Sequence, residues 1–271
     1  MTLSEAIEKM NLKEIKKSIA NGANIHEKNN RRETPLIQAI HCGDCEVVQI
    51  LIDAGANVNE ENELGETPLL HAVHCGDCEI VERLILAGAN VDATDYHKRT
   101  PLILAVLHNN TELVRTLLDA GADVNEQDAQ GHTALMLAKS EKTETSFYDR
   151  YLLGIKKEQK EEIIQLLASA ELIVATEEND LKKAKQAIAA GADINTQNAK
   201  GEVPLINASC GRDGNVKMVN LLLAAGADVN TKNWRGNTAL FHTQNQKIMH
   251  ILIKAGADIN IKNKKGETPL L

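Results

Sequence analysis

Aromatic side chains are scarce in this sequence, where two phenylalanines, three tyrosines and one tryptophan make up 2% of the 271 residues. This scarcity suits thin layers of helices packed through leucine, isoleucine, valine and alanine. Cysteine is sparse as well: five thiols, an odd number, do not have the density of a disulfide scaffold. The cysteine content therefore indicates a reducing compartment.

Long apolar stretches are also missing, since no run approaches the roughly 18–20 residues of a membrane span. The N-terminal stretch MTLSEAIEKMNLKEIKK has no apolar centre of the kind found in a secretory signal. The formal net charge of −8 argues against nucleic acid as the ligand, because neutralising phosphates takes clustered Lys and Arg. We therefore expect a cytoplasmic monomer, in its own cell or in one to which it is delivered, with no membrane or nucleic-acid partner.

A short marker of the form Gly-Ala-Asp/Asn-Val/Ile recurs along the chain, with successive spacings of 33, 33, 33, 70, 35 and 30 residues. A second marker, Thr-Pro/Ala-Leu, keeps step with the first. A period near 33 residues indicates a repeat array, in which units too short to close a core of their own stack on their neighbours. The first marker begins at Gly22, Gly55, Gly88, Gly121, Gly191, Gly226 and Gly256, and the second at Thr34, Thr67, Thr100, Thr133, Thr238 and Thr268, with Val203 as a variant.

Each unit predicts a helix, a turn, a second helix and a projecting β-turn finger. In the unit that begins at Thr67, the threonine can cap the first helix and Pro68 suits its first position. A polar turn at residues 75–77 precedes a second helix, which Gly88 ends. The apolar residues follow helical spacing. They are Leu69, Leu70, Ala72 and Val73 on the first helix and Ile80, Val81, Leu84, Ile85 and Leu86 on the second.

The combined pattern, TPL…GxxE followed by LL and GA-D/N-V-N, resembles the ankyrin repeat family over nearly all of the chain. The resemblance implies an all-α solenoid of about eight helix-turn-helix units with β-turn fingers and one insertion. One feature departs from the family: the histidine that usually follows Thr-Pro-Leu is absent from every unit. We therefore expect apolar packing in place of its imidazole hydrogen bond. The residues at that place are Ile37, Leu70, Ile103, Met136, Ile206 and Phe241.

The units predict two ankyrin stacks. Residues 1–170 would hold an N-terminal cap, three regular repeats and a fourth repeat with an insertion at 140–160. A new helix pair that begins at Glu171 resembles the cap and would open the second stack, residues 171–271. We expect the second stack to continue the first. The chain ends where another first helix would begin, which leaves a truncated product and a minimal cap as alternatives.

The sequence His-Cys-Gly-Asp-Cys occurs at residues 41–45 and again at 74–78, and its two C-x2-C pairs raise metal or redox chemistry. Adjacent helices lie roughly 8–10 Å apart, whereas tetrahedral zinc holds its sulfurs about 3.8 Å from one another. Cys45 and Cys78 occupy a place that is often Leu in ankyrin repeats, so we expect them to point into the helix packing. We predict no metal and no other cofactor.

Signatures of catalysis are missing from the sequence. It contains no phosphate-binding glycine loop, no His-Glu-x-x-His and no nucleophile elbow. The acidic residues suit solvated helix faces and finger turns, and Cys210 suits a packed small residue. We predict that the protein is not an enzyme and has no catalytic residues.

A binding surface is expected on the concave face, which the finger tips and the exposed side of the first helices would form. Tyr96 and Trp234 are the best anchors, because Trp, Tyr and Arg dominate interface hot spots. The alternative is that each ring covers a neighbouring finger. The predicted partner-binding residues on this face are Arg31, Arg32, His71, His74, Tyr96, His97, Lys98, Leu107, His108, Trp234 and Arg235, with Gln38, His41 and Leu104 beside them.

The insertion is a second candidate surface, because Phe147, Tyr148 and Tyr151 are half of the six aromatic residues. These side chains either bind a partner or seal the joint between the stacks. The finger asparagines are a further candidate, since they resemble hydroxylation targets in some ankyrin proteins but also suit a structural role in the turn. They are Asn59, Asn125, Asn195, Asn230 and Asn260.

The function predicted from these features is a non-catalytic scaffold or adaptor that binds a protein partner through the concave finger face. A first alternative is a bacterial effector that engages a host protein through the repeats, with which the ragged spacing and the Lys, Asn and Glu content are compatible. A second alternative is a metal- or redox-active module that uses the two Cys-Gly-Asp-Cys turns.

Overall fold

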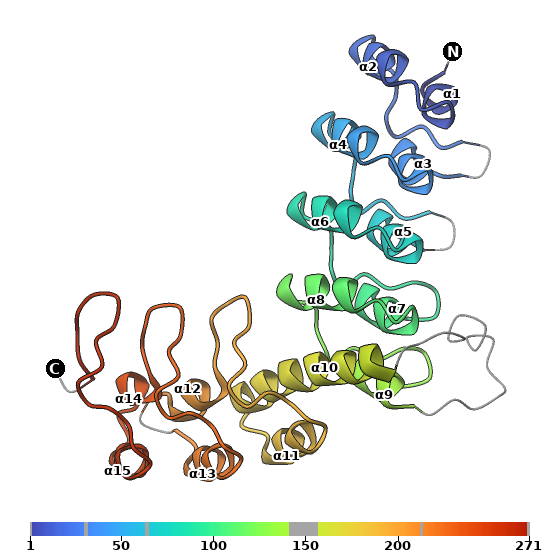
Figure 1. Cartoon of the computed structure of the whole chain (residues 1–271). Coiled ribbons are helices and arrows are strands. Elements are labelled where there is room, and N and C mark those ends of the chain that lie inside the picture. The colour runs from blue at the N-terminus through green and yellow to red at the C-terminus, as the bar shows by residue number, and fades with distance from the viewer. Residues whose placement is uncertain (1, 30–31, 63–64, 141–156, 212–213, 270–271) are drawn as a thin grey trace. The chain divides into compact units, whose positions relative to one another are not determined.

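A computed structural model describes residues 2–29, 32–62, 65–140, 157–211 and 214–269. Fifteen helices, α1 to α15, lie in these ranges, together with two isolated β-bridges and no named strand (Figure 1). The predicted all-α repeat fold is confirmed. The chain divides into two compact units, Met1–Lys160 and Glu161–Leu271, and each is described by itself. No helix in the described ranges is both long enough and apolar enough to cross a membrane.

The first unit consists of helix pairs stacked in two rows. The first helices contact one another in the order α1, α3, α5, α7 and α9, and the second helices in the order α2, α4, α6 and α8. We call these the inner and the outer row. Their bounds are α1 Leu3–Glu8, α2 Leu12–Ala20, α3 Pro35–Cys42, α4 Cys45–Asp53, α5 Pro68–Cys75, α6 Cys78–Leu86, α7 Pro101–Leu107, α8 Thr111–Asp119 and α9 Ala134–Lys139.

Local capping determines where these helices begin. The hydroxyl groups of Thr34, Thr67, Thr100 and Thr133 each accept a hydrogen bond from the backbone N–H three residues later. Such a cap stabilises a helix by about 1 kcal/mol. Gly76 has φ +75° and ends α5, and the Asp77 side chain then caps α6. The predicted order of cap, helix, turn and second helix is confirmed.

The core lies between the rows, and one of the apolar residues at helical spacing does not belong to it. Ile80, Val81 and Leu84 of α6 are fully buried, whereas Leu86 is 88% exposed. Leu86 follows Leu84 by about 200° of helical rotation, so the two side chains point to opposite sides of the helix. Leu86 thus lies on the predicted helix but outside its buried face.

A single helix replaces the two helices that the sequence predicted around residue 170. Helix α10 spans Lys157–Glu177 without a break, so no new helix begins at Glu171. The stretch EEIIQLLASAELIVATE contains no glycine or proline that would end a helix. The division into compact units falls inside this helix, and the predicted stack boundary after residue 170 stays a prediction. Residues 141–156 of the predicted insertion lie outside the described residues.

The second unit repeats the two-row arrangement. The first helices α12 and α14 contact each other and form the inner row of this unit. The second helices contact one another in the order α11, α13 and α15 and form its outer row. Val203 begins α12 without a side-chain cap, as its apolar side chain requires. The bounds are α11 Leu181–Ala189, α12 Pro204–Ser209, α13 Val216–Ala224, α14 Ala239–His242 and α15 Gln246–Lys254.

The fingers of neighbouring repeats are joined by side-chain hydrogen bonds. Asn59 accepts from the backbone N–H of Asn90 at 2.7 Å and donates to the Gly88 carbonyl at 3.1 Å. Asn195 and Asn230 accept in the same way from the backbone of the following finger, at 2.8 Å each. These bonds show a structural role for three of the finger asparagines that were candidates for modification.

Candidate functional site

Four imidazole rings meet on the inner row of the first unit, and we call them the histidine array: His41, His71, His74 and His108. His41 Nε2 lies 3.1 Å from His71 Nδ1, and their ring centroids are 4.8 Å apart. The centroids of His74 and His108 are 5.4 Å apart. The repeat period therefore brings three predicted binding residues, His71, His74 and His108, onto one surface.

Two carboxylates and an amide surround this array. Glu33 Oε1 lies 3.3 Å from His41 Nδ1, and Glu66 Oε2 lies 3.2 Å from His71 Nε2. Asn62 Nδ2 is 3.0 Å from the same His71 nitrogen. A neutral His71 meets these contacts in one of two tautomers. In one, its Nδ1–H donates to His41 and its Nε2 accepts from Asn62; in the other, its Nε2–H donates to Glu66 and its Nδ1 accepts from His41.

Burial favours the uncharged form of three rings of the array, His71, His74 and His108. Desolvation lowers the pKa of His71 and outweighs the opposing effect of Glu66. Desolvation likewise lowers the pKa values of His74 and His108. The lowered pKa values of these three rings suit hydrogen bonding to a partner better than attraction of a charged one.

The structure also corrects the expectation that imidazole hydrogen bonds are lost from every unit. They are made from the position one residue further along the first helix. His71 contacts Asn62 of its own finger, and His242 Nε2 lies 3.3 Å from the amide nitrogens of both Asn233 and Asn237. These two units therefore retain a ring-to-finger bond, although the histidine is shifted by one residue along the helix.

The finger of residues 95–99 presents three predicted binding residues around a buried carboxylate. Asp95 accepts hydrogen bonds from the backbone N–H groups of His97 and Arg99, at 2.9 Å each. Tyr96 is 66% exposed, and its ring lies 3.9 Å from that of His97. The His97 carbonyl accepts a bond from the next finger, and Lys98 is exposed. The buried Asp95 therefore holds an exposed aromatic side chain at the finger tip.

The Trp234 side chain packs against Gly201, which belongs to the preceding finger, and remains partly exposed to solvent. Gly201 has φ +78°, and a Cβ added there would overlap the Trp234 ring. The ring is still 54% exposed, and the guanidinium carbon of Arg235 lies 4.5 Å from its centroid. Both sequence alternatives apply in part, since the ring covers a finger on one side and is accessible on the other.

The remaining predicted residues are distributed unevenly. Arg32 is exposed and Leu107 is half-buried. Trp234 and Arg235 belong to the second unit and the other described residues to the first, so each unit has its own candidate surface. Four predicted residues lie outside the described ranges: Arg31, Phe147, Tyr148 and Tyr151.

The thiols of the Cys-Gly-Asp-Cys turns are held in protonated form. Burial, followed by a hydrogen bond with Glu112, raises the pKa of Cys78 to about 11. Burial also raises the pKa of Cys45, with contributions from Asp77 and Glu79. Both thiols are half-buried and bond to a glutamate of the next repeat, so the prediction that they point into the helix packing is only partly correct. Among the described residues, no three metal-type ligands come together.

Slow alkylation of Cys78 is expected from this arrangement. At pH 8 its rate should be about a hundredfold below that of an unperturbed thiol, because the thiolate fraction falls about tenfold for each unit of pKa. A time course with iodoacetamide, resolved by peptide mass spectrometry with glutathione as the reference thiol, would measure the rate. If Cys78 reacts faster than glutathione, the thiol is activated and the redox alternative gains support.

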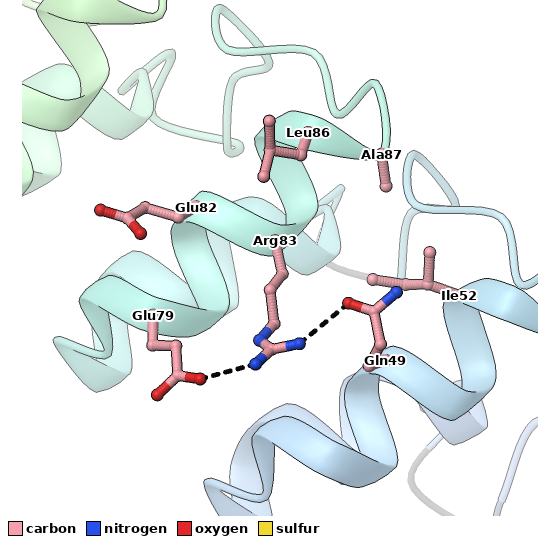
Figure 2. A pocket seen from close by; sticks show the side chains of 7 residues that line it. All are labelled: Gln49, Ile52, Glu79, Glu82, Arg83, Leu86 and Ala87. Atoms are coloured by element: carbon pink, nitrogen blue, oxygen red, sulfur yellow. Dashed lines mark hydrogen bonds and ion pairs between the residues drawn. The ribbon is translucent and has the colours of Figure 1, made fainter.

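A shallow hollow of about 500 Å³ lies on the outer row, between α4 and α6 (Figure 2). Arg83 crosses it and donates to Glu79 at 2.7 Å and to Gln49 at 3.0 Å. This hollow was not predicted from the sequence, although the position of Leu86, two residues after the buried Leu84, is a signal that it points away from the core. The hollow is lined by Gln49, Ile52, Glu79, Glu82, Arg83, Leu86 and Ala87.

Comparison with known protein families supports the repeat fold. The model of the family described as ankyrin repeats (three copies) matches residues 3–95, 76–161 and 172–263. No curated protein sequence matches the chain significantly. Ankyrin repeats are generally modules for protein–protein interaction and are typically non-catalytic. The matches cover far more than half of the sequence, and the chain therefore belongs to the ankyrin repeat family.

Proposed function

We propose that this chain is a non-catalytic adaptor or scaffold that binds a protein partner through its finger tips and inner helix faces. It would act as a monomer in the cytoplasm, either of its own cell or, as a delivered effector, of a host cell. The observation that carries the proposal is the exposure of two aromatic rings at finger tips, Tyr96 at 66% and Trp234 at 54%.

Exposed rings at these places are suited to anchoring a partner. Each finger is held in shape by its own hydrogen bonds, through Asp95 in the first unit and Asn233 in the second. A rigid ring loses little conformational freedom on binding, so more of its buried area contributes to affinity. In the same unit as Tyr96, the histidine array offers hydrogen-bonding groups, and burial favours the uncharged form of His71, His74 and His108.

Loss of both rings is expected to abolish capture of the partner. Trp234→Ala/Tyr96→Ala should raise the dissociation constant by about thirtyfold or more per hot spot, which corresponds to roughly 2 kcal/mol each. The measurement is a pull-down from cell lysate with wild type and variant, after circular dichroism and thermal unfolding show that both fold. The single variants then tell which unit is used.

A matched control removes exposed apolar surface elsewhere. Leu86→Ala/Ile253→Ala truncates two exposed side chains of the outer helices α6 and α15 and should leave capture unchanged. A partner that the double aromatic variant retains and the control loses would contradict the proposed surface and direct attention to the hollow beside Leu86.

A further inference from the structure

We infer that two adjacent fingers of the second unit bind an acidic segment of the partner protein. The inference rests on the proposed function and specifies the chemistry of the partner at one of its surfaces. Five cationic side chains lie on the fingers of residues 228–237 and 258–267, the first of which also carries the exposed ring of Trp234. The guanidinium carbon of Arg235 lies 4.5 Å from the centroid of that ring. This basic finger surface comprises Lys232, Arg235, Lys262, Lys264 and Lys265, all of them exposed.

The two finger tips are held against each other by backbone contacts. The Lys264 N–H donates to the Arg235 carbonyl at 3.1 Å. Gly236 has φ +80°, and a Cβ placed on it would lie 3.0 Å from the Lys264 nitrogen. Side chains from the two tips therefore belong to one continuous surface, with the Trp234 ring beside it.

The carboxylates of these fingers are engaged by the fingers themselves. Asp228 and Asp258 accept hydrogen bonds from the backbone N–H groups of Asn230 and Asn260, at 2.9 and 2.8 Å. Glu267 accepts from Asn263 Nδ2 at 2.8 Å. Among the described residues, none of the five cations forms an ion pair with a carboxylate. Positive charge thus exceeds negative charge at the tips, and the cationic ends remain available to a partner.

The fingers of the first unit show the contrasting arrangement. Lys28 lies 3.4 Å from the carboxylate of Glu60 on the next finger, and Arg99 is paired with the buried Asp95. These cations are thus neutralised within the chain. The five cations of the basic finger surface differ from these two in having no such carboxylate partner among the described residues.

Charge complementarity favours a carboxylate-bearing protein segment as the occupant. An apolar side chain of that segment can lie on the open face of Trp234 while flanking carboxylates contact the lysines and Arg235. Single-stranded nucleic acid is the competing polyanion. It is disfavoured because successive bases need several stacking rings, whereas this surface has one, and because the chain carries a net charge of −8.

The lone tryptophan of the chain provides a direct readout. The probe is a synthetic peptide in which glutamates flank a central pair of leucines. Titration of the full chain with this peptide should produce a saturable change in Trp234 fluorescence, and the affinity should fall as ionic strength rises. Arg235→Glu/Lys264→Glu/Lys265→Glu should weaken binding by about tenfold or more, since each exposed charge pair contributes up to about fivefold and the variant changes three charges.

The matched control changes the net charge equally on the outer helices of the same unit. Lys185→Glu/Lys217→Glu/Lys247→Glu alters exposed residues of α11, α13 and α15 and should change the affinity by about twofold at most. Circular dichroism checks that both triple variants fold. Equal loss in the two variants would overturn the inference, because the effect would then come from overall charge.

Two further outcomes separate this inference from the proposed function. If oligothymidine binds more tightly than the acidic peptide at the same ionic strength, the surface recognises nucleic acid and the inference fails. If Arg235→Glu/Lys264→Glu/Lys265→Glu captures the lysate partner as well as the wild type does, while the double aromatic variant loses it, the acidic-segment inference fails and the proposed function stands. If this triple variant loses the partner and the control triple variant retains it, the result supports the inference.

Discussion

Replacing Asp95 with alanine is expected to lower the free energy of unfolding of the first unit by about 3–5 kcal/mol, as for the breaking of a buried ion pair. The Asp95 carboxylate has no solvent exposure, and the Arg99 side chain is 12% exposed. Arg99 donates to Asp95 Oδ2 from Nε at 2.6 Å and from Nη2 at 2.5 Å. The substitution removes this counter-charge and also leaves two backbone N–H groups of the finger without their acceptor.

The variant Asp95→Asn separates the loss of the counter-charge of Arg99 from the loss of the backbone hydrogen bonds. Other fingers have asparagine at the place of Asp95, for example Asn62 and Asn233, and accept the same backbone bonds. Asp95→Asn should therefore keep the turn, lose only the charge pairing and cost less than Asp95→Ala. Urea unfolding followed by circular dichroism would measure both variants.

Asp128 provides the control for the charge effect. It occupies the same place in the next finger, but its ion-pair neighbour His132 is half exposed and lies 3.4 Å away. Asp128→Ala should thus destabilise less than Asp95→Ala. Equal losses in the two alanine variants would contradict a dominant role for the buried charge pair and assign the stability to the backbone bonds.

Acidification is expected to destabilise the first unit, and the histidine array is the reason. Burial lowers the pKa values of His71, His74 and His108 from the ordinary 6.5, so the unfolded chain binds protons that the folded chain does not. This contribution to stability is fully present above pH 6.5. It is lost as the pH falls from there through the lowered folded-state pKa values. The slope is at most about 1.4 kcal/mol per pH unit for each imidazole.

The charged neighbours of the array modify the size of this effect but not its direction. Glu66 and Glu33 favour protonation of His71, while His41 and His74 oppose it. Asp95 favours and Arg99 opposes protonation of His74. Desolvation is the largest cause for each of the three rings, so the net direction is downward. Carboxylates with lowered pKa, such as Glu79, contribute only near and below pH 4.5, and the experiment should therefore stay above that value.

The matching measurement is urea unfolding at a series of pH values on both sides of 6.5. His71→Gln should flatten the pH dependence, and it introduces the residue that α3 has at the equivalent position, Gln38. His250→Gln, on an exposed position of α15, is the control that should leave the profile unchanged. A wild-type chain that becomes more stable between pH 6.5 and 5, or a His71→Gln profile as steep as that of the wild type, would contradict this explanation.

Features that depend on residues close together in the chain could be predicted from the sequence. Thr67 caps α5, Gly76 ends it and Asp77 begins α6 through hydrogen bonds that span only a few residues. The 33-residue period then implies stacking, because a single helix pair cannot bury its own apolar face. The fold class, the repeat pattern and the exposure of Tyr96 and Trp234 follow from this local information.

Features that depend on the meeting of different repeats were decided only by the tertiary structure. His41 and His71 are 30 residues apart in the chain, and Trp234 lies on Gly201 from the neighbouring finger. The exposure of Leu86 likewise depends on which helix faces find a neighbour. Caps and periodicity act within one repeat, whereas contacts across the stack depend on side-chain direction and register, and the spacing of the markers alone does not specify these.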